Sequence, residues 1–217
     1  MSAVVNRPRF ADAEAFLAWE AMQPVRHEYV DGQVYPKTGA LGAQDTIARN
    51  TIARNTVARN TVAHNTITLN AYASLRPALR GTPCRAYCMD LKLRVNDKGD
   101  FLYPDLMVTC DARDRPSVED SFISHPWLIA EVLSDSTAAY DRGRKFELYR
   151  SIATLTHYLL IEQDRPHADL FFKNEQGQWV LQALTADDAI EIERLGQPWP
   201  VATLFEEVDF TPAAPRA

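Results

Sequence analysis

The chain has 217 residues, of which 46% are hydrophobic and 24% are charged, and its formal net charge is −6. This length and composition are typical of one globular domain with a sizeable core, so we expect residues 1–217 to form a single domain. No apolar run is long enough to span a membrane, and the first ten residues lack the apolar block of a secretion signal. We therefore expect no membrane association.

The charge is unevenly distributed along the chain. Residues 45–100 carry nine Lys or Arg and four Asp, a net charge of +5, which leaves −11 for the remainder. A basic segment can contact phosphate groups while an acidic segment holds a metal ion. Charge alone is equally compatible with two solvated surfaces of opposite sign.

Three cysteines, Cys84, Cys88 and Cys110, fall in predicted strands. We interpret them as small buried apolar residues of a protein in a reducing compartment, and so expect a cytoplasmic location. Cys84 and Cys88 have no further Cys or His at zinc spacing, which argues against a zinc site.

The N-terminal part predicts a helix and then a hairpin. Over residues 11–22, apolar side chains recur at positions 13, 16, 17 and 21, which is helical spacing. Asp31-Gly32 between two short apolar pairs predicts a two-residue turn within residues 26–36. Glu28 lies on the first strand of this hairpin.

Residues 46–70 are five successive pentads, TIARN TIARN TVARN TVAHN TITLN. We expect an insertion at about 46–65 that extends a helix over 64–80 toward its N-terminus, with Gly81 as the stop and Pro77 kinking or shortening the last turn. Two alternatives remain open. A pentapeptide-repeat β-helix would have barely more than one coil here, and a disordered loop is favoured by the weak helix propensity of Thr, Val, Ile and Asn.

The second half of the chain alternates strands with one helix. The pattern predicts strands over 84–95 and 101–109, a polar loop over 111–124, a strand over 127–133, a helix over 137–150 and a strand over 156–162. Segments 171–184 and 190–192 are expected to form a peripheral C-terminal hairpin. The prediction is a mixed α/β (α+β) domain with the core order helix, strand, strand, strand, helix, strand.

Two of the predicted strands each contain one carboxylate, Asp105 and Glu131. A buried carboxylate is costly without compensation, and two on neighbouring strands repel each other unless a cation lies between them. Lys145 follows on the predicted helix, and two carboxylates with one lysine are the components of a divalent-metal phosphodiesterase centre. The simpler alternatives are a salt bridge from either carboxylate to one of the basic residues 142, 144 and 145, and a surface i,i+4 pair of Lys145 with Asp141.

Four segments, HEYVDGQVY, YPDLMV, LIAEVLSDST and YDRGRKFELYR, occur in this order, with a His before a helix between the first two. Together they resemble the Uma-type restriction endonucleases of the PD-(D/E)xK nuclease superfamily, over residues 8–208. The resemblance implies a restriction-endonuclease-like core and a Mg²⁺ ion, which Mn²⁺ could replace. Its ligands would be Asp105, Glu131 and the backbone carbonyl of Val132.

The resemblance is incomplete at the third motif position, where Leu133 occupies the place of the lysine. It implies that Lys145 on the next helix takes over this role and that Glu28 completes the acidic cluster. Glu28 could instead be an ordinary hairpin charge. His64 is more typical of a structural residue than of a ligand, Asp90 could approach the same site, and Tyr149 is expected in the core.

We therefore expect a Mg²⁺-dependent endonuclease that hydrolyses phosphodiester bonds in DNA, as a homodimer because two-fold symmetry suits the cutting of both strands. A second hypothesis is a catalytically weak nucleic-acid-binding module that retains the fold. A third is an interaction protein that assembles through its pentads.

Overall fold

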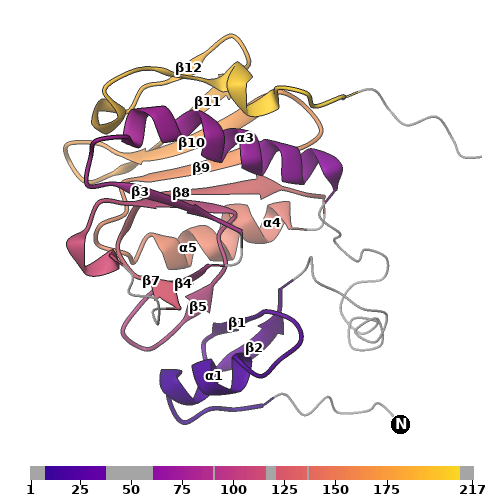
Figure 1. The fold of residues 1–217 in the computed structure, drawn as a ribbon, viewed down its shortest axis with the longest axis vertical. Helices are drawn as coiled ribbons and strands as arrows, with labels where there is room; N and C mark the ends of the chain where they lie inside the picture. The colour runs from indigo at the N-terminus through magenta and orange to yellow at the C-terminus, as the bar shows by residue number, and fades with distance from the viewer. Residues whose placement is uncertain (1–7, 38–60, 90, 116–120, 136, 211–217) are drawn as a thin grey trace, which may run out of the picture.

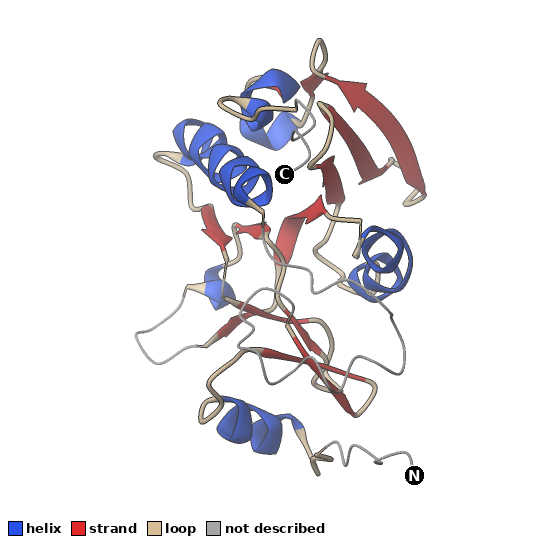
Figure 2. Cartoon of the chain, turned by 90° about the vertical axis from the view of Figure 1, so that its right-hand side faces the viewer, coloured by secondary structure: helices blue, strands red, loops and turns tan. Residues whose placement is uncertain are grey.

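The computed structural model describes residues 8–37, 61–89, 91–115, 121–135 and 137–210. A larger sheet lies between helices on its two faces, and a smaller sheet with its own helix lies beside it (Figures 1 and 2). The expected mixed α/β architecture is confirmed.

The larger sheet has six strands in the order β11-β10-β9-β8-β6-β3. Strands β8 and β9 are parallel, and the other neighbours are antiparallel. All eight residues of β8 are buried, because helices cover both faces of this central strand. The strand bounds are β3 Arg85–Cys88, β6 Leu106–Thr109, β8 Pro126–Leu133, β9 His157–Glu162, β10 His167–Lys173 and β11 Trp179–Thr185.

One face of this sheet is covered by α3 (Val62–Leu79), which packs on the even-numbered side chains of β8. The helix begins where Thr61 accepts a hydrogen bond from the His64 N–H, and it is followed by Gly81 at φ 76°. Pro77 lies in the last turn, and the helix still runs to Leu79. The last two pentads thus form the helix cap and its first turns, while residues 46–60 lie outside the described part.

The opposite face is covered by one continuous helical segment between β8 and β9. It consists of α4 (Ala138–Tyr140), a π-helical turn η2 (Asp141–Lys145) and α5 (Phe146–Tyr149). The helix predicted over 137–150 is confirmed apart from its π-helical part. The predicted core order corresponds to α3, β3, β6, β8, this segment and β9.

The smaller sheet has the strand order β2-β1-β5-β4-β7, and helix α1 (Ala13–Glu20) packs on it through Phe16. Asp31 and Gly32 have φ angles of 49° and 75°, as the predicted hairpin turn requires. The predicted N-terminal helix and hairpin are both confirmed. The strand bounds are β1 His27–Val30, β2 Gln33–Pro36, β4 Lys92–Arg94, β5 Phe101–Leu102 and β7 Phe122–Ile123.

Two long predicted strands, one from alternation and one from an apolar run, are wrong in the same way. The segment 84–95 divides into β3 and β4, and 101–109 divides into β5 and β6, with one half in each sheet. The chain leaves the larger sheet after β3 at Met89, where φ is 69°. It leaves the smaller sheet after β5 near Pro104, which has no N–H for a ladder hydrogen bond. Asp105 consequently precedes β6 instead of lying within a strand.

The predicted C-terminal hairpin lies at one edge of the larger sheet, with β11 as the edge strand. Strands β10 and β11 pair along seven residues each and extend the six-stranded sheet beyond β9. The chain then forms the short pair β12 (Ala189–Ile190) and β13 (Trp199–Pro200) and the 3-10 turn η4 (Val201–Phe205), which packs on α3.

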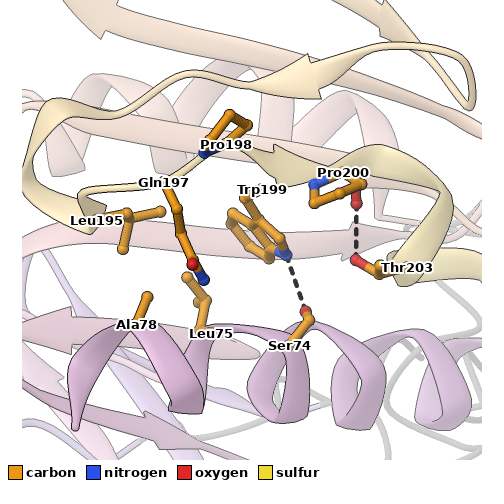
Figure 3. Close-up of a pocket in the computed structure, with 9 residues that line it drawn as sticks. All are labelled: Ser74, Leu75, Ala78, Leu195, Gln197, Pro198, Trp199, Pro200 and Thr203. Atoms are coloured by element: carbon orange, nitrogen blue, oxygen red, sulfur yellow. Dashed lines mark hydrogen bonds between the residues drawn. The ribbon is translucent and has the colours of Figure 1, made fainter.

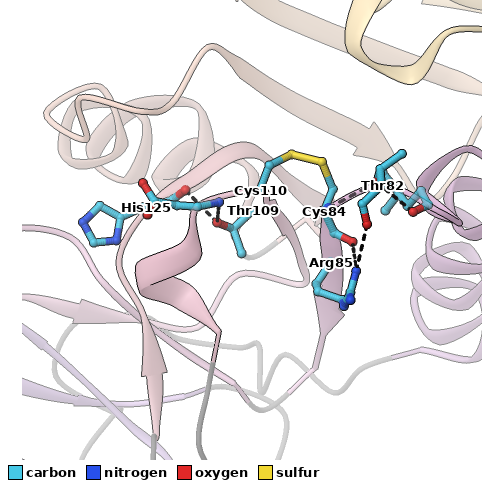
Figure 4. Close-up of a disulfide and its surroundings, with 8 residues drawn as sticks. Thr82, Cys84, Arg85, Thr109, Cys110 and His125 are labelled. Atoms are coloured by element: carbon cyan, nitrogen blue, oxygen red, sulfur yellow. Dashed lines mark hydrogen bonds between the residues drawn. A yellow bond between two sulfur atoms is a disulfide. The ribbon is translucent and has the colours of Figure 1, made fainter.

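The cysteine prediction is also wrong for two of the three residues. Cys84 and Cys110 form a disulfide, while Cys88 is free (Figure 4). The register that pairs Arg85 with Thr109 brings Cys84 and Cys110 opposite each other at the ends of β3 and β6. Strand pairing, which residue type alone does not reveal, therefore joins them.

Among the described residues, no helix has both the length and the apolar character that crossing a membrane requires.

Candidate functional site

Glu131 lies at the centre of a buried polar cluster under the π-helical turn. Its side chain points to the face of β8 that the helical segment covers, and only 2% of the side chain is exposed. Oε1 of Glu131 accepts hydrogen bonds from Lys145 Nζ at 3.0 Å and from Tyr149 Oη at 2.7 Å. The apolar runs on either side of Glu131 make β8 a fully buried strand, so this carboxylate is stabilised only by groups that the fold brings to it.

Asp105 reaches the same region from the segment that leads into β6. Its Oδ2 accepts a hydrogen bond from the backbone N–H of Val132 at 2.9 Å and lies 3.2 Å from Nε2 of His64. Val132 follows Glu131 directly, and the charge of Asp105 acts on the Glu131 carboxyl, so the two predicted carboxylates lie in the same region of the molecule. The Asp105 side chain is 16% exposed, so it lies nearer the surface than Glu131.

Lys145 is the buried cation of the cluster. Its ammonium group lies 3.0 Å from Glu131 and 3.0 Å from Asp141, and its side chain is 10% exposed. The ion-pair alternative for Glu131 is thus present in the structure, and the pair with Asp141 is buried instead of lying on the surface. The π-helical turn carries both members of this i,i+4 pair, and such turns occur frequently at functional sites.

The other two basic residues of this turn have different partners. Arg142 pairs with Glu162 at the end of β9 and with Asp169 within β10. Arg144 pairs with Glu147 and with Asp31 in the β1–β2 turn, so it joins the helical segment to the N-terminal hairpin.

Glu28 is the fourth predicted residue, and β1 brings it to the edge of the cluster. Its Oε1 accepts a hydrogen bond from the Tyr103 N–H at 3.4 Å, and the side chain interacts electrostatically with Lys145. Burial raises the pKa of the Glu28 carboxyl, and Lys145 opposes this shift only in part. The structure therefore brings the other three predicted side chains together around Lys145.

The two principal carboxylates have opposite electrostatic behaviour. Burial, together with the neighbouring charges of Asp105 and Asp141, raises the pKa of Glu131 to about 8 against the charge of Lys145. Burial also raises the pKa of Asp105, but hydrogen bonding and charge from His64 outweigh it and lower the value to about 2. For Lys145, burial lowers the pKa, yet Glu131 and Asp141 raise it well above its ordinary value. At neutral pH, Asp105 is thus an anion and Lys145 a cation.

Sequence reasoning missed two members of the cluster. Tyr149 is fully buried as expected, but its hydroxyl also contacts Glu131. Its place four residues after Lys145, on the same helical face, was a usable signal. His64 contacts Asp105 across 41 positions in sequence, and no local pattern indicates this pair. Asp90 lies outside the described residues.

Within the described ranges, no group of three or more His, Cys, Asp or Glu side chains is arranged to hold a metal ion. The residues that could contribute are the two carboxylates and a backbone carbonyl.

An apolar pocket of about 200 Å³ lies elsewhere, between α3 and the segment around Trp199 (Figure 3). Charged side chains are absent from its lining, so it offers nothing to an ion.

Comparison with a solved structure defines the class of fold. The chain is similar to the crystal structure of a protein from Anabaena variabilis ATCC 29413 described as a "putative nuclease belonging to DUF820". The TM-score is 0.65, with 90% of this chain and 98% of that chain covered, at 14% sequence identity. At this identity the similarity shows the fold alone.

Sequence comparison gives the family. Residues 54–202 match the family model Uma2, described as "Putative restriction endonuclease". The chain is 34% identical over 197 residues to Uncharacterized protein slr1290 of Synechocystis, covering 91% of this chain and 92% of that protein. It is 28% identical over 190 residues to Uncharacterized protein sll1609 of the same organism, covering 88% and 96% respectively. The chain belongs to the Uma2 family, which confirms the resemblance noted in its motifs.

Proposed function

We propose that this protein is a Mg²⁺-dependent endonuclease that hydrolyses phosphodiester bonds in DNA. The observation that carries the proposal is the hydrogen bond from the Val132 N–H to Asp105. It holds the Asp105 carboxylate next to Val132, the residue that directly follows Glu131. The family description supports the reaction class.

The cluster contains oxygen atoms of the kind that a hard cation binds. No described residue donates a hydrogen bond to Oδ1 of Asp105 or to Oε2 of Glu131, because the contacts of both side chains use the other oxygen. The N–H and C=O of one extended residue point to the same edge of a strand. Since the Val132 N–H points to Asp105, the Val132 carbonyl is directed to that side as well. Mg²⁺ keeps several waters and needs only one or two carboxylates, so these three oxygens suffice.

Asp105, Glu131 and the Val132 carbonyl would hold the ion. When bound, Mg²⁺ supplies charge neutralisation at the phosphate and lowers the pKa of a bound water. Lys145 has the role of a second positive charge beside Glu131, where it offsets the negative charge that develops on the phosphate. Glu28 extends the acidic cluster on the side of the N-terminal hairpin.

Plasmid nicking with Mg²⁺ or Mn²⁺ tests the proposal. We expect cleavage by the wild type and a loss of at least 100-fold in Asp105→Asn and Glu131→Gln, because each removes a ligand charge while keeping the shape. Glu175→Gln, an exposed residue of the β10–β11 turn, is the matched control and should cleave normally. Equal cleavage by wild type and both site variants would refute the proposal.

A protein that binds DNA without metal-dependent cleavage would instead support the second hypothesis, a binding module that has kept the fold. The observation that favours it is Leu133 at the lysine position of the family motif. Sedimentation of the wild type tests the proposed homodimer separately, and a monomer at working concentration would exclude it.

A further inference from the structure

His64 is a buried imidazole that contacts one proposed metal ligand, Asp105, and has no role in the proposed reaction so far. The residue is 8% exposed, and its Nε2 lies 3.2 Å from Oδ2 of Asp105. The same oxygen accepts the Val132 N–H at 2.9 Å. Two groups from two different elements, α3 and β8, therefore hold a single oxygen of Asp105.

The position of the imidazole is fixed by the first turn of α3. Thr61 accepts a hydrogen bond from the His64 N–H at 3.0 Å, and the Thr68 hydroxyl donates one to the His64 carbonyl at 2.9 Å. The next turn is anchored by Ile67, which is fully buried in the core between α3 and the larger sheet. The contact with Asp105 is thus made by a rigid part of the molecule.

The surroundings of the other ring nitrogen, Nδ1, are incompatible with a direct chemical role for His64. Nδ1 of His64 is buried and has no hydrogen-bond partner among the described residues. A nitrogen shielded in this way cannot exchange protons with a substrate water, and Nε2 already faces the Asp105 carboxylate. Neither nitrogen is placed to act as a general base.

We propose that His64 is a positioning residue for Asp105. Its Nε2–H holds Oδ2 so that Oδ1 is presented to the cation, as outer hydrogen-bond partners do for the ligands of other metal sites. This inference depends on the proposed function, because it assigns a role toward the ion that Asp105 would bind.

The chain contains a matched control at the other end of β6. Nδ1 of His125 lies 2.9 Å from Asp114, and the His125 carbonyl accepts a hydrogen bond from Thr109, the last residue of this strand. His125→Leu therefore breaks a second His–Asp pair, which lies near the far end of β6, and leaves the contacts of Asp105 unchanged.

The experiment measures Mn²⁺ binding directly, by electron paramagnetic resonance of free Mn²⁺, in wild type, His64→Leu, His64→Gln and His125→Leu. We expect 10- to 100-fold weaker binding in His64→Leu, which is the typical loss for an outer-shell partner. In His64→Gln the amide Nε2 can replace the lost donor, so binding should recover to within about threefold. His125→Leu should bind as the wild type does, and thermal melts establish that each variant is folded.

Mn²⁺ binding in His64→Leu equal to that of the wild type would overturn the positioning role and leave the proposed function intact. Absence of Mn²⁺ binding in the wild type would overturn both. If His64→Leu does not fold, nitrogen NMR of ¹⁵N-histidine-labelled wild type decides the matter, because our inference requires that Nε2 keeps its proton when Mg²⁺ is added. Loss of that proton would make His64 a ligand or base and refute the positioning role.

Discussion

Replacing Lys145 by Met removes the only buried cation that contacts Glu131 among the described residues. The two side chains are 10% and 2% exposed, so the Glu131 carboxyl that remains is shielded from water and either stays an unsolvated anion or takes up the proton that its raised pKa of about 8 favours. Asp141, the second partner of Lys145, is also buried and would lose its counter-charge. Breaking a buried pair in this way costs about 3–5 kcal/mol, and for a chain of this size we expect the melting temperature to fall by roughly 10 °C.

Urea unfolding followed by tryptophan fluorescence measures this loss. The matched control is Arg144→Met on the same helical turn, where both ion pairs lie at the surface and should contribute less than the buried pair. In the double variant that also carries Glu131→Gln, the loss of unfolding free energy should be smaller than the sum of the two single losses, because no charge is then left buried on β8. A Lys145→Met protein within about 0.5 kcal/mol of the wild type would show that this pair is not buried as described, and would refute the reasoning.

Three further predictions concern other parts of the fold. Reducing the Cys84–Cys110 disulfide, which closes a loop of 26 residues, should lower stability by about 3.5 kcal/mol; an unchanged urea midpoint in dithiothreitol would contradict this. Burial lowers the pKa of His157 to about 4, so the unfolded chain binds a proton first and stability should fall by up to about 3 kcal/mol as pH decreases from 6.5 to 4. His157→Gln should lack this pH dependence. Tyr149→Phe removes one hydrogen bond to Glu131 and should lower the free energy of unfolding in urea by about 1.5 kcal/mol. An unchanged free energy of unfolding would mean that water solvates this hydroxyl.

Several elements were determined by the sequence alone, because their signals are local. The hairpin follows from Asp31-Gly32, a pair that tolerates positive φ, and the stop of α3 follows from Gly81. Strand β8 follows from an uninterrupted apolar run, and Glu131 is conspicuous because it is the one charge within that run. The apolar run around Asp105 and the helix that follows β8 put Asp105 and Lys145 in the candidate site, the family resemblance added Glu28, and the structure brings these side chains together.

Tertiary structure alone decided how these segments are divided and which distant groups meet. Alternation continues across the break within 84–95, and apolar residues stand on both sides of the break within 101–109, so the residue pattern does not reveal that the chain passes from one sheet to the other. The disulfide and the contact of His64 with Asp105 depend on strand register and helix placement. Such contacts arise from packing between segments far apart in sequence, whereas the residue pattern records only what each segment buries by itself.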